Sequence, residues 1–172
     1  PVDVSECSPY HLKSDKFYLD AIDEIFSDYE GNKDYMFTLL RGMIARIRAK
    51  DVSPDNMCVG GTGLFSVSAA GKIYPCHLLT DVDSYYMGNV HTPEESKEQF
   101  DKIFDLLKNY SRYSSEICSK CFGNKLCIGC LGGNNFRTGD GFKGDPFICN
   151  MYRKVIEKII VWMASEQENE NS

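Results

Sequence analysis

The stretch CSKCFGNKLCIGC, residues 118–130, decides how this chain folds, because it brings four cysteines into one short run. Three more cysteines extend it to the pattern C-x12-G-x4-C, gap, C-x2-C-x5-C-x2-C, gap, C. The seven cysteines are Cys58, Cys76, Cys118, Cys121, Cys127, Cys130 and Cys149. Thiolates at such spacing converge on soft metals, because short loops bring several sulfurs close to one point. Seven ligands exceed the four of one tetrahedral site, so the pattern predicts two metal centres with interleaved ligands.

Two other interpretations of the cysteines are weighed against this one. A zinc ribbon uses two C-x2-C pairs, but the pairs here are separated by only five residues, and Cys58, Cys76 and Cys149 would have no role. A disulfide framework suits a secreted protein, and we expect no secretory signal for this one. The C-x2-C spacing fits metal binding in a reducing compartment, so we expect a cytoplasmic protein.

Composition narrows the class of protein. The chain has 172 residues, of which 42% are hydrophobic, enough for one domain with an appendage. The net charge is −6 with no basic block, which argues against nucleic acid as a partner. No apolar run approaches a membrane-spanning length, so we expect no membrane partner. The first residue is Pro1 rather than Met, and we expect a fragment or a processed piece.

The sequence pattern predicts a small α+β fold. Alternation over 64–69 and a turn at Gly71 indicate a β-hairpin at 64–76. Thr92 and Glu95 form a capping-box pattern that opens a helix at 93–109. Glycine-rich loops follow over 114–149, then a terminal helix over 150–164. A helical arm at 15–50 precedes the hairpin, and residues 165–172 have the composition of a disordered tail.

The cysteine array resembles the SPASM domain, the auxiliary-cluster domain at the C-terminus of radical SAM (S-adenosylmethionine) enzymes. The match covers about residues 57–155. Three further segments resemble the same domain: Ile73-Tyr74-Pro75-Cys76-His77, Met87-Gly88-Asn89-Val90 and Thr138-Gly139-Asp140. Residues 1–30, which include Ser8-Pro9-Tyr10, resemble the end of a radical SAM barrel. The chain departs from the family pattern in one spacing: two residues separate Cys127 from Cys130, where the family usually has three. The C-x3-C-x2-C motif that binds the SAM-cleaving cluster is absent from this chain.

The resemblance implies a domain division and two cofactors. Residues 1–56 would be a helical arm from the end of the barrel, residues 57–164 the auxiliary-cluster domain, and residues 165–172 the tail. Two [4Fe–4S] clusters are implied. The ligands of one would be Cys118, Cys121, Cys127 and Cys149, and those of the other Cys58, Cys76 and Cys130. The three-cysteine cluster would keep one iron open to solvent, a substrate thiolate or Cys7, although Cys7 is better explained as a partly buried free cysteine.

The resemblance also implies a function. The chain would serve a radical SAM enzyme that modifies a ribosomally made peptide, forming a thioether crosslink from a cysteine. Its partners would be the radical SAM barrel and a cysteine-containing precursor peptide, and the chain alone would be inactive. The alternatives are a sulfatase-maturase-like domain with two electron-transfer clusters and a stand-alone zinc module.

Three other side chains are candidates for tuning the clusters. His77 follows a ligand, and it either hydrogen-bonds a cluster sulfur or packs on the hairpin. Arg137 and Lys143 lie among the predicted cluster loops. They either offset cluster charge or are ordinary solvated charges. The apolar faces of the arm are expected to meet the barrel.

Overall fold

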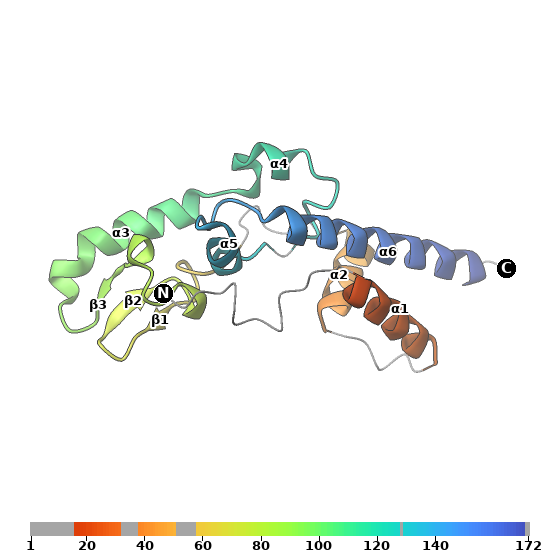
Figure 1. Cartoon of the computed structure of the whole chain (residues 1–172), viewed down its shortest axis with the longest axis horizontal. Helices are drawn as coiled ribbons and strands as arrows, with labels where there is room; N and C mark the ends of the chain where they lie inside the picture. Colours follow the sequence, from red (N-terminus) through yellow and green to blue (C-terminus); the bar gives the residue numbers. More distant parts are fainter. Residues whose placement is uncertain (1–15, 32–37, 51–57, 128, 171–172) are drawn as a thin grey trace. The chain divides into compact units, whose positions relative to one another are not determined.

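The structure is a computed structural model, and it describes residues 16–31, 38–50, 58–127 and 129–170 (Figure 1). Contacts divide the chain into two compact units. One unit comprises Pro1–Lys50 with Met151–Ser172, and the other comprises Asp51–Asn150. The predicted division is different, because it assigned the C-terminal helix to the cluster domain. Each unit is described by itself below.

The second unit contains a small antiparallel sheet that includes the predicted hairpin. Strand β1 (Ser66–Val67) pairs with β2 (Lys72–Tyr74), and β2 pairs with β3 (Gly88–Asn89). The first pairing sets Ser66 opposite Tyr74, which confirms the hairpin within 64–76. Strand β3 belongs to the Met-Gly-Asn-Val segment, which was singled out for its resemblance and not as a strand. Two short 3-10 helices, η1 (His77–Leu79) and η2 (Asp83–Tyr85), connect β2 to β3.

Helix α3 (Pro93–Asn109) lies beside the sheet and matches its predicted bounds (Figure 1). Its apolar face buries Ile103 and Leu107 in a core with Leu79, Met87 and Leu131. This face follows the helical spacing expected from the sequence. The predicted capping box is wrong in one respect: the Thr92 side chain makes no capping hydrogen bond.

The glycine-rich region contains more regular structure than its composition predicts. A 3-10 turn, η3 (Arg112–Ser114), is followed by α4 (Glu116–Ser119) and α5 (Leu131–Thr138). Helix α5 was not predicted, because its sequence LGGNNFRT includes two adjacent glycines and has weak helical propensity. It ends at Gly139, whose φ of 77° is the left-handed conformation usual after a helix.

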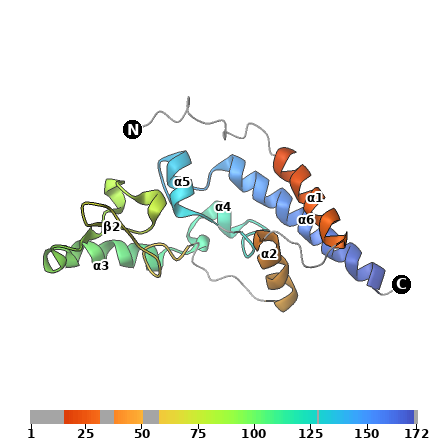
Figure 2. The ribbon, with the colours of Figure 1, turned by 90° about the horizontal axis from the view of Figure 1, so that it is seen from below.

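The first unit contains α1 (Lys16–Gly31), α2 (Thr38–Ala49) and most of α6 (Pro146–Glu170). Helix α1 lies along α6 (Figure 2), where the Phe26 and Trp162 rings stack with centroids 4.8 Å apart. Lys158 on α6 pairs with Asp23 on α1 at 2.5 Å. The arm was expected to turn its apolar faces to a barrel, but these contacts show that α1 uses at least part of its apolar face to pack on α6.

Helix α6 continues through Glu170, so the predicted start of a disordered tail at residue 165 is wrong. The sequence SEQENE contains good helix formers, and its high charge does not prevent it from extending a helix that is already nucleated. Among the described residues, no helix combines the length and the apolar character needed to cross a bilayer.

Candidate metal centres

The hairpin fixes the glycine of the C-x12-G-x4-C motif. Gly71 closes the turn by donating its N–H to the Ser68 carbonyl over 2.9 Å, with a φ of 76° that favours glycine. A Cβ added at Gly71 would lie 2.6 Å from Cδ2 of His91 and 2.7 Å from Oδ1 of Asn89. The backbone conformation and the close approach of the segment around β3 therefore both require glycine here. In the sequence, Cys76 comes two residues after the end of β2.

Three cysteine thiols share an environment around η1. Burial raises the pKa of the Cys76 thiol, and backbone N–H groups of Leu78 and Leu79 donate to this sulfur and lower the pKa. The neighbouring thiols of Cys130 and Cys58 raise it again. Such mutual effects arise only between groups that lie close together. Geometry places two of them as neighbours, because a Cβ added at Gly60 would lie 3.4 Å from Sγ of Cys58 and 3.8 Å from Cβ of Cys76. We treat Cys58, Cys76 and Cys130 as one set, the three-cysteine set.

The other two sulfurs of this set also accept backbone hydrogen bonds. The Gly60 N–H donates to Sγ of Cys58 over 3.2 Å, and the Gly133 N–H donates to Sγ of Cys130 over 3.3 Å. Hydrogen bonds to sulfur tune the reduction potential of iron–sulfur clusters. The local backbone is thus suited to hold these sulfurs as thiolate ligands.

Helix α5 brings Cys130 towards Cys76 through a close approach at Gly132. Cys130 is the N-cap residue of α5. A Cβ added at Gly132 would lie 2.5 Å from Cβ of Leu78 and 3.4 Å from Sγ of Cys76. Only glycine allows the first turn of α5 to lie this close to η1.

The other four cysteines form a second set. Burial raises the pKa of the Cys127 thiol to about 11, with further increases from Cys149, Cys118 and Cys121. The guanidinium of Arg112 acts in the opposite direction and lowers it. Cys118 lies in α4 and Cys149 in the first turn of α6, so the set joins segments that are distant in sequence.

Tight turns hold three of these four cysteines, Cys118, Cys121 and Cys127, in one loop. The Cys121 N–H donates to the Cys118 carbonyl over 3.1 Å, and the Cys127 N–H donates to the Gly123 carbonyl over 2.9 Å. The Asn124 side-chain amide donates to the Cys118 carbonyl over 2.6 Å. Its Oδ1 is buried, with no hydrogen-bond partner among the described residues. Backbone and side-chain hydrogen bonds thus define this loop where apolar packing is sparse.

The donor chemistry fits iron–sulfur clusters. In the described part of the chain all seven cysteines are free thiols, and no three or more His, Cys, Asp or Glu side chains converge as a ready-made site for one ion. A four-iron cluster sets its ligand sulfurs farther apart than a single zinc ion does, because each sulfur binds a different iron. The grouping of the cysteines into two ligand sets and their ligation of clusters both stay predictions.

Arg112 is the functional candidate that the sequence did not suggest. It is 5% exposed, and its Nη1 donates to the Asn124 carbonyl and, over 3.2 Å, to the Cys127 carbonyl. A capping box between Ser111 and Ser114 fixes the η3 turn that carries it. The signal available in the sequence was weak: one arginine among tyrosines and serines just before the first C-x2-C.

The other proposed tuning residues differ in their surroundings. Arg137 pairs with Asp145 at 3.1 Å and lies over the Phe147 ring, so an ion pair already engages its charge. Lys143 is exposed on a loop, as an ordinary solvated charge would be. The His77 side chain is exposed at the start of η1, and its bond to a cluster sulfur stays a prediction. Cys7 lies outside the described residues.

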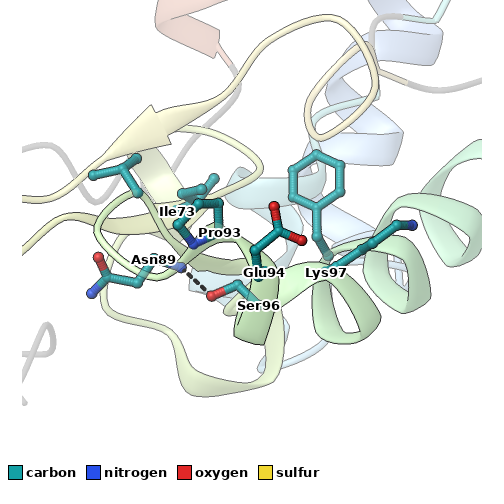
Figure 3. A pocket seen from close by; sticks show the side chains of 8 residues that line it. Ile73, Asn89, Pro93, Glu94, Ser96 and Lys97 are labelled. Carbon is teal, nitrogen blue, oxygen red and sulfur yellow. Dashed lines mark hydrogen bonds between the residues drawn. The ribbon is translucent and has the colours of Figure 1, made fainter.

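A pocket of about 580 Å³ lies beside β3 and the start of α3, and no cysteine lines it (Figure 3). Its polar contact is the Asn89 N–H, which donates to Oγ of Ser96 over 2.9 Å. Gly88 allows this approach, because a Cβ there would lie 2.5 Å from that of Ser96. The pocket is thus a product of sheet–helix packing, separate from both cysteine sets.

Comparison with known proteins gives two similar sequences. The chain is 30% identical over 115 residues to an AdoMet-dependent heme synthase of Nitratidesulfovibrio vulgaris, covering 60% of this chain and 30% of that protein. It is 30% identical over 91 residues to an AdoMet-dependent heme synthase of Methanosarcina barkeri, covering 52% of this chain and 25% of that protein. No family model matches the chain.

The chain spans less than a third of the length of these relatives. Their names describe enzymes that depend on S-adenosylmethionine (AdoMet), so the similarity supports a relationship to the radical SAM enzymes. It does not single out the thioether-forming peptide maturases within them.

Proposed function

We propose that this chain binds two [4Fe–4S] clusters as the auxiliary-cluster part of a radical SAM enzyme. The observation that carries the proposal is the array of seven free thiols on short, hydrogen-bonded segments: Cys118, Cys121 and Cys127 share one loop, and Cys130 begins the helix whose Gly132 lies against Cys76. A set of four cysteines completes the ligands of one cluster, and a set of three leaves one ligand of the second cluster to be supplied from elsewhere. The similarity to AdoMet-dependent enzymes supports the same assignment.

The chain's own residues would hold and tune the clusters. Cys118, Cys121, Cys127 and Cys149 supply a complete set of ligands, whereas the set around Cys76 supplies three. The clusters would bring one-electron redox chemistry and a Lewis-acidic iron to the site. The protein contributes sulfur position, backbone N–H donors and a partly water-excluding environment.

An incomplete set of three suits a substrate that brings its own thiolate. A cysteine-containing peptide would bind the iron that Cys58, Cys76 and Cys130 leave open, because a thiolate is a strong soft ligand and a hydroxyl is not. The peptide should perturb the cluster spectrum, and its serine analogue should not. The effect should disappear in Cys76→Ala. Equal spectra with both peptides would contradict this substrate class.

The first experiment is anaerobic iron and sulfide analysis of the reconstituted chain with an ultraviolet–visible spectrum. We expect about eight irons and eight sulfides per chain, with a broad charge-transfer band from cysteine-bound clusters. Stoichiometric zinc without colour would instead assign a zinc module.

The relatives' names favour a second candidate substrate, a porphyrin on the route to haem. Both candidates rest on the same clusters and differ in how the substrate meets them. A porphyrin carries no thiolate, so it would leave the ligation of the three-cysteine cluster unchanged. Tight binding of a porphyrin, with no response to the cysteine peptide, would favour this candidate.

A further inference from the structure

We propose that Arg112 is a positioning residue that sets the charge around the four-cysteine cluster and so raises its reduction potential. The inference rests on the proposed function, because it requires a cluster on Cys118, Cys121, Cys127 and Cys149. It assigns to Arg112 a role distinct from ligation.

The location of Arg112 carries the first part of the argument. The residue is 95% buried, and burying a guanidinium costs free energy that its surroundings must offset. Two of its acceptors are the carbonyls of Asn124 and Cys127, in the same loop that carries the thiols. The arginine is therefore fixed against the cluster loop and does not extend into solvent.

The charge of Arg112 carries the second part. A cluster with four thiolate ligands has a net negative charge, and reduction makes it more negative. A fixed positive charge stabilises the reduced form more than the oxidised form, and a buried position limits screening by water and salt.

Arginine suits this position because Nη1 donates to two carbonyls and the charge of a guanidinium is permanent. The charge itself is reproduced by lysine. Two substitutions therefore separate the two roles. Arg112→Gln keeps hydrogen-bond donors and removes the charge, whereas Arg112→Lys keeps the charge and removes the planar guanidinium.

The test is a redox titration of the full chain, reconstituted anaerobically, with dithionite as the one-electron donor and mediators, followed by electron paramagnetic resonance. Iron and sulfide content is measured first for each variant, so that a failure to bind clusters in the wild type refutes the proposed function separately. Cys76→Ala removes a ligand of the other set and identifies which signal belongs to the four-cysteine cluster.

We expect Arg112→Gln to lower the equilibrium constant for reduction of this cluster at least tenfold, a shift of about 59 mV to more negative potential. Arg112→Lys should stay close to wild type. Lys125→Gln is the matched control: it removes an equal charge from the same loop at an exposed position, and it should change little.

Three results would overturn the proposal: an unchanged potential in cluster-loaded Arg112→Gln, an equal shift in Lys125→Gln, or a shift in Arg112→Lys as large as in Arg112→Gln. If Arg112→Gln fails to bind iron, the iron content and potential of Arg112→Lys distinguish the charge role from a purely structural role. Full loading at the wild-type potential supports the charge role, and equal loss of iron refutes it in favour of a purely structural one.

Discussion

A methyl group added at Gly132 tests the contact that holds α5 against η1. The Cβ of Gly132→Ala would lie 2.5 Å from Cβ of Leu78, whereas carbon atoms prefer about 3.5–4.0 Å, so one segment must move by about 1 Å. Leu78 Cβ is attached directly to the backbone and cannot rotate away. The displacement would carry Cys130 away from Cys76.

The magnitude follows from two opposed effects. Overpacking costs about 1–3 kcal/mol, and replacing glycine by alanine in a helix returns up to about 1 kcal/mol. We therefore expect Gly132→Ala to reduce the free energy of unfolding by up to about 2 kcal/mol. Gly133→Ala is the matched control, because its added Cβ would have ordinary contacts of 3.4 and 3.5 Å with Cys130. It should be neutral or slightly stabilising.

Urea unfolding followed by circular dichroism measures the difference between these variants, and iron analysis measures its consequence. Gly132→Ala should lose iron from the three-cysteine set before the four-cysteine set. If Gly132→Ala and Gly133→Ala were equally stable and bound equal iron, the close approach of α5 and η1 would not be what positions Cys130.

Three further outcomes concern α6. Asp145→Ala should cost about 1 kcal/mol of stability by removing the acceptor for the Ile148 N–H at the start of the helix, measured by thermal unfolding, and an unchanged midpoint would contradict the cap. Burial would raise the pKa of Asp145, but the Ile148 N–H and Arg137 outweigh it and leave the pKa below its ordinary 3.8. This stabilisation is therefore present above about pH 4 and lost as the pH falls through the lowered pKa, so an acid titration of wild type and Asp145→Ala should converge at low pH. Phe26→Ala should cost about 3–5 kcal/mol and change the fluorescence of Trp162, the single tryptophan, and an unaltered emission spectrum would argue against the stacked contact.

The local elements with a clear pattern could be predicted from the sequence. The hairpin around Gly71 and helix α3 follow from alternation, turn residues and helical spacing. Helix α5 could not, because tertiary contact with η1 stabilises a segment whose glycines disfavour a helix. The extension of α6 through residues 165–170 was not predicted, because the high charge of this segment indicates that it is solvated and does not indicate whether it is helical.

The grouping of the cysteines was implied by the family resemblance and stays a prediction, whereas the cysteine spacing alone indicated that the thiols could bind soft metals. It could not indicate Arg112, because burial of a single charged residue depends on contacts with distant segments, here the carbonyls of the 124–127 loop. It also could not predict that Arg137 pairs with Asp145, because neither residue belongs to a recognisable pattern.

The most direct test of two separate cysteine sets is iron content per chain after a single substitution in each set. Reconstituted Cys121→Ala and Cys76→Ala should each lose about half of the wild-type iron, and their remaining spectra should differ, because each keeps a different cluster. Complete loss of iron in both variants, or identical residual spectra, would contradict the account of two independent centres.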